Sequence, residues 1–161
     1  MTVSTRRNRV DAPEVAPGNL PVYEVRRKAV GNHDYLLEVW QLPSPPTPRL
    51  DHPELLATLK GTALRLLETR LAKRLARAGV RLGGEASGAE RRWTIDEELA
   101  LILGLLFRAL APMRNLDRIR QVADGIDAMS REEAGYWLGM AMHQQRPRRV
   151  LAALRLLLDR E

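Results

Sequence analysis

The sequence predicts a mainly α (α+β) protein: a four- to five-helix bundle with a small amino-terminal β-hairpin. Leucines repeat at steps of three and four residues over most of the second two-thirds of the chain, as they do along amphipathic helices. Strand-forming residues stand on both sides of the turn-forming run Gly31-Asn32-His33-Asp34. The length of 161 residues suits a single compact domain.

The amino-terminal region divides into three predicted segments. Residues 1–20 mix polar residues with Pro and Gly and show no apolar period, so we expect a disordered arm. Residues 21–42 form the β-hairpin, which must lie on helices or gain a partner strand because two strands alone are marginally stable. Residues 43–50 hold four prolines and form a Pro-rich linker.

A long basic amphipathic helix is expected over residues 51–79. Asp51 can cap it, Pro53 suits its first turn, and Gly79 should end it. Its apolar stripe is spaced at three and four residues and comprises Leu56, Leu59, Ala63, Leu66, Leu67, Leu71 and Leu75. Residues 80–93, with three glycines, then form a flexible loop.

Residues 94–161 are predicted to be a helical domain of four packed helices. The spacing of Thr94 and Glu97 is that of a capping box and should open a helix to about Leu110, which is apolar nearly all round and therefore central. A second helix should run from about Asn115 to Asp124 and be closed by Gly125.

Two further helices complete the predicted domain. Ser130 and Glu133 form a second capping box, and the helix that they open buries Trp137. Pro147 starts the last helix, whose apolar face includes Leu154. Both Trp137 and Leu154 are expected in the core.

Composition excludes several kinds of chemistry. The chain has no cysteine, which removes disulfides, thiol nucleophiles and thiolate metal sites and favours the cytoplasm. The longest apolar run, residues 99–107, is about half the ~20 residues that cross a bilayer, so no membrane association is expected.

The net charge of +6 is concentrated in one segment. Residues 60–81 hold seven basic residues and one acid, so the rest of the chain is neutral. On a helix the basic residues would share one face that could follow phosphates: Arg70, Lys73, Arg74, Arg77 and Arg81. The alternative is a solvated helix face in an arginine-biased protein, since 23 of the 26 basic residues are arginines.

A second basic cluster surrounds Pro147. Arg146, Arg148 and Arg149 stand at the start of a predicted helix, where free amides and guanidinium groups together could bind an anion. A solvated helix start is again the alternative.

The remaining polar residues match no established catalytic or metal-binding motif. His33, His52 and His143 have no metal-ligand spacing, and no phosphate loop or nucleophile elbow is present. Asp124 and Asp127 could bind a cation or share a proton, but such pairs more often cap helices. We therefore predict a protein without cofactor, metal site or enzymatic activity.

Three segments resemble a family of short uncharacterised bacterial proteins: Leu106–Asn115, Ala128–Gly139 and Arg148–Arg155. The resemblance covers about Trp93 to Leu158 and implies a place in multi-gene anti-phage defence loci beside helicases and methyltransferases. It transfers no catalytic residue. The expected function is a non-enzymatic accessory or scaffolding subunit that binds a larger protein, and the alternative is a small helical subunit that binds nucleic acid directly and without sequence preference.

Overall fold

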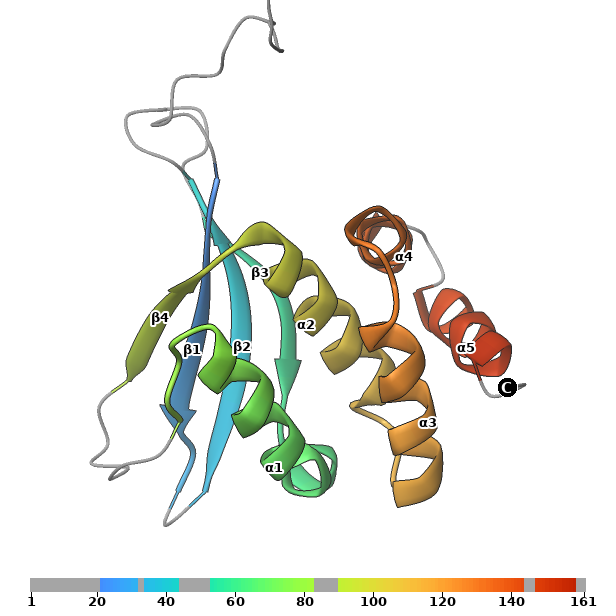
Figure 1. Ribbon diagram of the computed structural model, residues 1–161, viewed down its shortest axis with the longest axis horizontal. Helices are drawn as coiled ribbons and strands as arrows, with labels where there is room; N and C mark the ends of the chain where they lie inside the picture. Colours follow the sequence, from blue (N-terminus) through green and yellow to red (C-terminus); the bar gives the residue numbers. More distant parts are fainter. Residues whose placement is uncertain (1–20, 32–33, 44–52, 83–89, 144–146, 159–161) are drawn as a thin grey trace, which may run out of the picture.

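The computed structural model describes residues 21–31, 34–43, 53–82, 90–143 and 147–158. The predicted arm, almost all of the Pro-rich linker, the glycines of the predicted loop, and Arg146 lie outside these residues. The described residues form four strands and five helices (Figure 1), which are in chain order β1 (Val22–Ala29), β2 (Tyr35–Leu42), β3 (Glu54–Leu59), α1 (Gly61–Arg77), β4 (Arg91–Ile95), α2 (Glu97–Leu110), α3 (Leu116–Asp127), α4 (Arg131–His143) and α5 (Pro147–Leu158).

The predicted β-hairpin is confirmed, but it is the centre of a larger sheet. The strand order is β3-β2-β1-β4, and all neighbours are antiparallel. Val25 of β1 stands opposite Val39 of β2 on one side and Trp93 of β4 on the other. The fold is therefore α+β. The expectation of a helical bundle with a two-stranded hairpin is wrong, because β3 and β4 of the same chain pair with the two strands of the hairpin.

Strand β3 replaces the first turns of the predicted helix 51–79. Leu56 and Leu59 are spaced as on a helix, yet both are buried in a strand whose Leu59 pairs with Leu37 of β2. Lys60 is extended, and Gly61 has a φ of 70°, so the chain changes direction there before α1 begins. Pairing with the apolar strand β2 outweighs the local helical spacing.

Strand β4 covers the end of the predicted flexible loop 80–93 and the first two residues of the predicted helix that follows it. Its residues Trp93, Thr94 and Ile95 are aromatic or β-branched, which suits a strand. Thr94 pairs with Glu24 of β1 and does not cap α2. The cap is Asp96, whose carboxylate accepts a hydrogen bond of 2.8 Å from the amide of Leu99.

The two faces of the sheet differ in chemistry. Val25, Leu37 and Val39 alternate onto the face that the core covers and have no exposed surface. On the opposite face the guanidinium of Arg26 lies 4.5 Å from the centre of the Trp40 ring. Glu38 accepts a hydrogen bond of 2.8 Å from the Trp40 indole and pairs with the ammonium of Lys28 at 3.1 Å. Polar cross-strand contacts thus cover the face of the sheet opposite the core.

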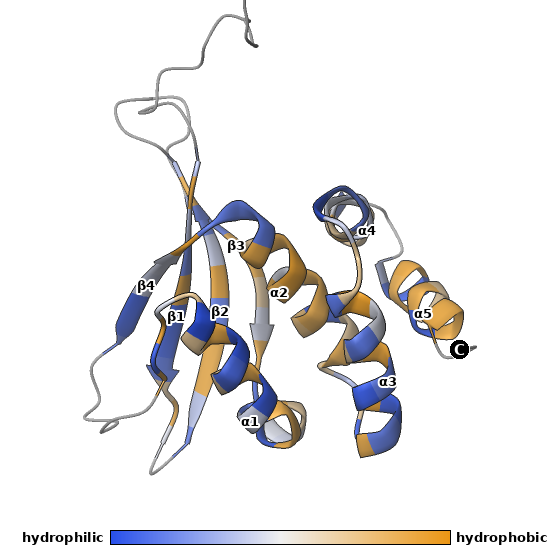
Figure 2. Cartoon of the chain, in the orientation of Figure 1, coloured by the Kyte–Doolittle hydropathy of each residue, from blue (hydrophilic) through white to orange (hydrophobic). Residues whose placement is uncertain are grey.

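Helix α2 is the centre of the molecule, as its sequence predicted. It lies between the sheet and the group formed by α3, α4 and α5 (Figure 1), and nearly all of its residues are apolar (Figure 2). A side chain at Gly104 would come within 3.0 Å of Leu138 in α4, so the glycine allows the close approach of these two helices. Helix α1 packs its own stripe of Leu67, Leu71 and Leu75 into the core.

The remaining helices largely follow the predicted pattern. Asn115 caps α3, and the Ser130–Glu133 capping box is confirmed by reciprocal hydrogen bonds of 3.0 and 3.1 Å. Gly125 does not end α3. A side chain there would come within 2.7 Å of Leu158, so the glycine makes room for α5 instead.

The two residues expected in the core differ in burial. Leu154 is fully buried, as predicted. Trp137 is only partly buried against the core, and its ring meets that of Tyr136 edge to face, with the centres 5.8 Å apart. Within the described residues, no helix has the length and apolar content that a membrane span requires.

Candidate functional site

Helix α1 carries most of the predicted basic face. Lys73 and Arg77 are exposed on it, while Arg70 and Arg74 are half-buried. Arg81 is exposed but does not share the helix face, because α1 ends at Arg77 and the chain turns at Gly79, whose φ is 83°. The predicted end of the helix at Gly79 is confirmed, and the predicted row of basic residues is shorter by one turn.

Arg70 is held by two carboxylates of α3. Its Nη2 donates hydrogen bonds of 2.6 Å to Asp124 Oδ1 and 2.7 Å to Asp127 Oδ2. Burial alone would lower the pKa of Arg70, but the hydrogen bonds and charges of Asp127 and Asp124 outweigh it, so that the pKa is raised. Arg74 adds an ion pair of 3.6 Å with Asp127. These contacts tie α1 to α3.

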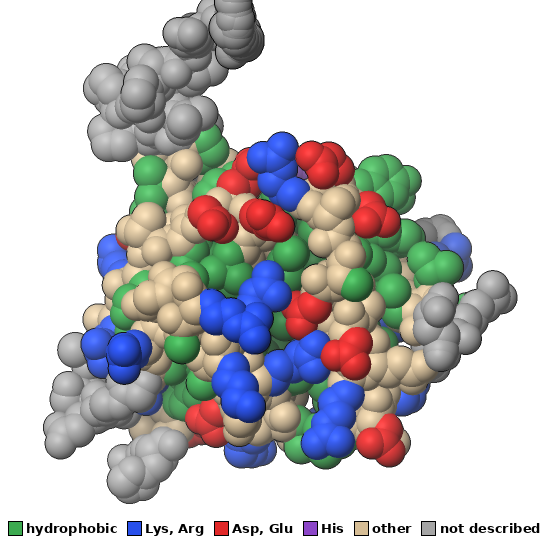
Figure 3. Space-filling model, viewed as in Figure 1, with side chains coloured by type: hydrophobic (Ala, Val, Ile, Leu, Met, Phe, Trp, Pro, Cys, Tyr) green, Lys and Arg blue, Asp and Glu red, His purple; other side chains and the backbone are tan. Residues whose placement is uncertain are grey.

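These ion pairs neutralise part of the positive charge on the basic face of α1. Figure 3 shows Lys and Arg side chains over α1 interleaved with Asp and Glu side chains. A nucleic acid that approached Arg70 or Arg74 would meet Asp124 and Asp127 as well. The two aspartates are engaged as partners of arginine, and no group of three or more possible metal ligands occurs in the described part of the chain.

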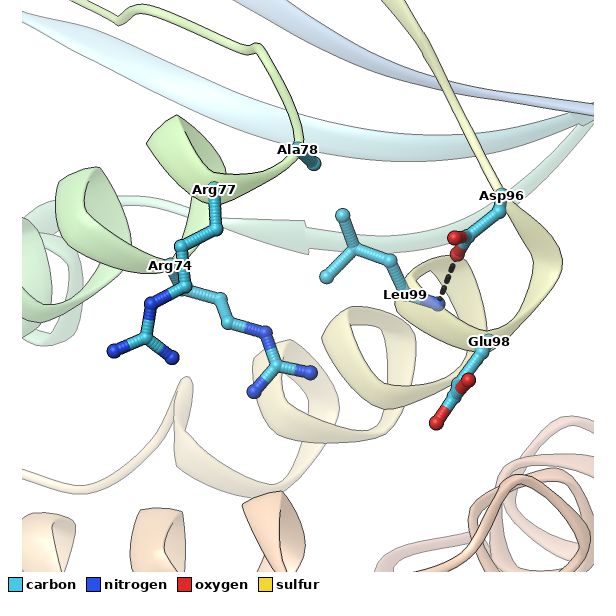
Figure 4. Close-up of a pocket in the computed structure, with 6 residues that line it drawn as sticks. All are labelled: Arg74, Arg77, Ala78, Asp96, Glu98 and Leu99. Carbon is cyan, nitrogen blue, oxygen red and sulfur yellow. Dashed lines mark hydrogen bonds between the residues drawn. The ribbon is translucent and has the colours of Figure 1, made fainter.

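A small cleft separates the end of α1 from the start of α2. It has a volume of about 260 Å³ and is lined by Arg74, Arg77, Ala78, Asp96, Glu98 and Leu99 (Figure 4). The arginines extend from one side and the carboxylates stand on the other, where Asp96 is bound to the amide of Leu99. Because both signs of charge line this cleft, it offers a phosphate no uniform positive field.

The second predicted cluster is partly described. Arg148 and Arg149 are exposed in the first turn of α5, while Arg146 lies outside the described residues. Arg148 also lines a pocket with Arg108 and Arg155, two residues that the sequence patterns did not single out. Of the histidines, His143 is exposed at the end of α4 and belongs to no group of three or more possible metal ligands among the described residues, and the other two lie outside those residues.

An exposed apolar surface lies over α4 and α5. Tyr136 of α4 is 61% exposed, and Leu156 and Leu157 of α5 are 61% and 51% exposed. Hydrophobic side chains gather over these two helices in Figure 3. We call these three residues the α4–α5 surface. Of the leucines of the last helix, the sequence placed Leu154 in the core, and it did not predict the exposure of Leu156 and Leu157.

The chain also matches a known family of domains. Residues 23–160 match the family described as Domain of unknown function (DUF7680). The chain belongs to this family. No curated protein and no solved structure matches the chain.

The DUF7680 match runs from β1 past the end of α5 and so includes the sheet, the ion pairs between α1 and α3, and the α4–α5 surface. The description of the DUF7680 family names no activity, so a function can be inferred only from the residues of this chain.

Proposed function

We propose that this DUF7680 protein is a non-enzymatic accessory subunit that binds a larger protein through the α4–α5 surface. The observation that carries the proposal is the exposure of Tyr136, Leu156 and Leu157 on neighbouring helices. Apolar residues grouped at the surface of a monomer are a recurrent feature of protein interfaces. Burying two leucines and a tyrosine would contribute several kcal/mol, at about 1.5–3 kcal/mol for each large side chain.

Two charged residues of α5 specify the partner further. Arg148 and Arg149 are exposed on the same helix as Leu156 and Leu157. Charged groups at the rim of an interface favour partners of opposite charge and raise the rate of association. We therefore propose a partner with an apolar centre and acidic residues beside it.

The biological setting is part of the same proposal. The resemblance of Leu106–Asn115, Ala128–Gly139 and Arg148–Arg155 to short proteins of anti-phage defence loci supports a nucleic-acid-processing defence complex in the bacterial cytoplasm. The absence of cysteine is consistent with that compartment. The products of the neighbouring genes are then the first candidate partners.

The test is co-expression of the chain with each neighbouring gene product, followed by co-purification in high salt. The variant Leu156→Asp with Leu157→Asp should lose the partner, because two carboxylates would stand at the apolar centre. Val30→Asp is the matched control, since Val30 is 46% exposed beside the β1–β2 turn and should leave binding unchanged. Circular dichroism and thermal melting establish that both variants fold.

Two outcomes would contradict the proposal. One is a complex that survives both substitutions in α5. The other is self-association of the isolated chain that light scattering detects and that the same substitutions abolish, because a second copy would then occupy the surface.

Direct nucleic-acid binding is the second candidate function, and it is supported by the exposed basic residues Lys73, Arg77 and Arg81. Changing these three to glutamate leaves the ion-pairing residues Arg70 and Arg74 unchanged, and circular dichroism of the triple variant establishes that it folds. Contact with phosphates predicts that log affinity falls with log salt at a slope of about −0.9 per phosphate on duplex DNA, or about −0.7 on single strands. We expect weak binding without sequence preference. A nanomolar, sequence-selective complex that the triple variant abolishes would favour this second function over the first.

A further inference from the structure

A pocket distinct from the basic face of α1 lies between the carboxyl end of α2 and one face of α5. It has a volume of about 560 Å³ and is lined by Arg108, Ala111, Pro112, Arg148, Leu151 and Arg155. This volume falls within the range of about 300–1,000 Å³ that small-molecule sites occupy. Residues 148, 151 and 155 share a face of α5 because they are three and four residues apart.

The charged groups described around this pocket are all cations. Nε of Arg108 donates a hydrogen bond of 2.5 Å to the carbonyl oxygen of Leu56, and Nη1 of Arg155 donates one of 2.9 Å to that of Ala109. Both acceptors are neutral. A guanidinium has five N–H donors, so most of the donors of Arg108 and Arg155 are not used by these two bonds. Neither guanidinium is within ion-pair distance of a carboxylate among the described residues.

Partial burial makes the positive charges of Arg108 and Arg155 energetically unfavourable. Burial lowers the pKa of Arg108, with partial compensation from the charge of Glu54. Burial also lowers the pKa of Arg155, and the nearby charge of Arg118 lowers it further. The contrast with Arg70 is direct, since the two aspartates of α3 raise the pKa of that residue. A partly buried cation with no carboxylate at ion-pair distance is stabilised when an anion enters.

The rest of the lining is apolar. Leu151, Pro112 and Ala111 complete the described wall beside the three guanidinium groups. Arginine binds carboxylates and phosphates through two parallel N–H bonds, whereas aliphatic side chains favour a carbon skeleton. The pocket therefore offers guanidinium groups for an oxyanion and aliphatic side chains for a carbon skeleton.

We propose that this pocket binds a small organic oxyanion, in which a carboxylate or phosphate group contacts Arg108, Arg148 and Arg155 and an apolar body lies on Leu151 and Pro112. This site goes beyond the proposed partner surface, since it needs no second protein and shares with the proposed partner interface only Arg148. Arg148, which the sequence placed in a possible anion site at a helix start, takes part here together with arginines from two other positions.

Isothermal titration calorimetry of the full chain at low salt tests the site with phenyl phosphate, benzoate and inorganic phosphate. We expect saturable binding of one phenyl phosphate or one benzoate, and the tighter of the two identifies the preferred oxyanion. Phenyl phosphate should bind about tenfold more tightly than inorganic phosphate, because burial of the ring adds an apolar contribution.

Arg148→Gln is the informative variant. Arg148 is exposed, so its loss should leave the fold intact, and loss of its charged hydrogen bonds should weaken binding about tenfold. Arg149→Gln is the matched control, because Arg149 is the next residue of the same helix but does not line the pocket, and it should bind as the parent does. The proposal is overturned if none of the probes binds saturably at millimolar concentration. It is also overturned if Arg148→Gln binds like the parent, or if Arg149→Gln loses binding to the same extent.

Discussion

Replacing Arg70 should uncouple α1 from α3, and a double-mutant cycle can measure how strongly. The guanidinium of Arg70 is 32% exposed and contacts Asp127, 27% exposed, and Asp124, 70% exposed. Two unit charges at 4 Å interact by about 4 kcal/mol at an effective dielectric constant of 20. Solvent screening and the free energy of ordering the side chains reduce this to about 1 kcal/mol or less for exposed pairs.

These values lead to unequal couplings. We expect about 1 kcal/mol between Arg70 and the more buried Asp127, and less than about 0.5 kcal/mol between Arg70 and the more exposed Asp124. Arg70→Ala should therefore lower the free energy of unfolding by about 1–2 kcal/mol. Arg70→Glu should lower it further, because a third carboxylate would then face the two aspartates.

The assay is urea unfolding followed by circular dichroism for the parent, Arg70→Ala, Asp127→Asn, Asp124→Asn and the two double variants that combine Arg70→Ala with either aspartate change. The slope of unfolding free energy against urea should not change, and the coupling should shrink in molar salt. Arg77→Ala is the control, since Arg77 is exposed and should cost less than about 0.5 kcal/mol. A coupling below about 0.3 kcal/mol for both aspartates would refute the role given to these ion pairs.

Two further predictions concern the core and the tyrosine of β2. Leu154 is fully buried, so Leu154→Ala should cost about 2–5 kcal/mol in urea unfolding, and a loss below about 1 kcal/mol would contradict the packing of α5. Tyr35 donates a hydrogen bond of 2.6 Å to Glu68, and burial, followed by the hydrogen bond and charge of Glu68, raises its pKa above the ordinary value. Its contribution to stability is thus complete below about pH 10 and is lost as pH rises beyond it, because the unfolded chain releases the proton first. Tyr35→Phe should accordingly lose less stability than the parent between pH 8 and pH 11, and an equal loss in both proteins would exclude this contribution.

Local patterns predicted the features that depend on neighbours along the chain. The β1–β2 hairpin, the Ser130–Glu133 capping box, the glycine turn at Gly79 just after α1 and the start of α5 at Pro147 all occur as expected. The central position of α2 followed from its apolar surface on all sides. Each of these signals is a turn, a cap or a periodic face that a few adjacent residues define.

The errors lie where distant residues decide the local structure. Leu56 and Leu59 suit a helix as well as a strand, and β2 selects the strand, in which Leu59 pairs with Leu37. Trp93 and Ile95 have strand-forming side chains, but their short segment acquires a partner only because the chain returns to β1 after α1. Gly125 suggested a helix end, whereas the close approach of Leu158 explains it.

The charge distribution shows the same division most clearly. The sequence alone determined that residues 60–81 carry the whole net charge of +6 and that the amphipathic segment presents basic residues opposite its leucines. Only the tertiary structure decided that Asp124 and Asp127 meet Arg70, and that Arg108, Arg148 and Arg155 meet at one pocket. The amino-acid sequence sets the type of each charged group and its spacing along the chain. The interaction between charged groups depends on their distance in space, which the packing of the helices determines.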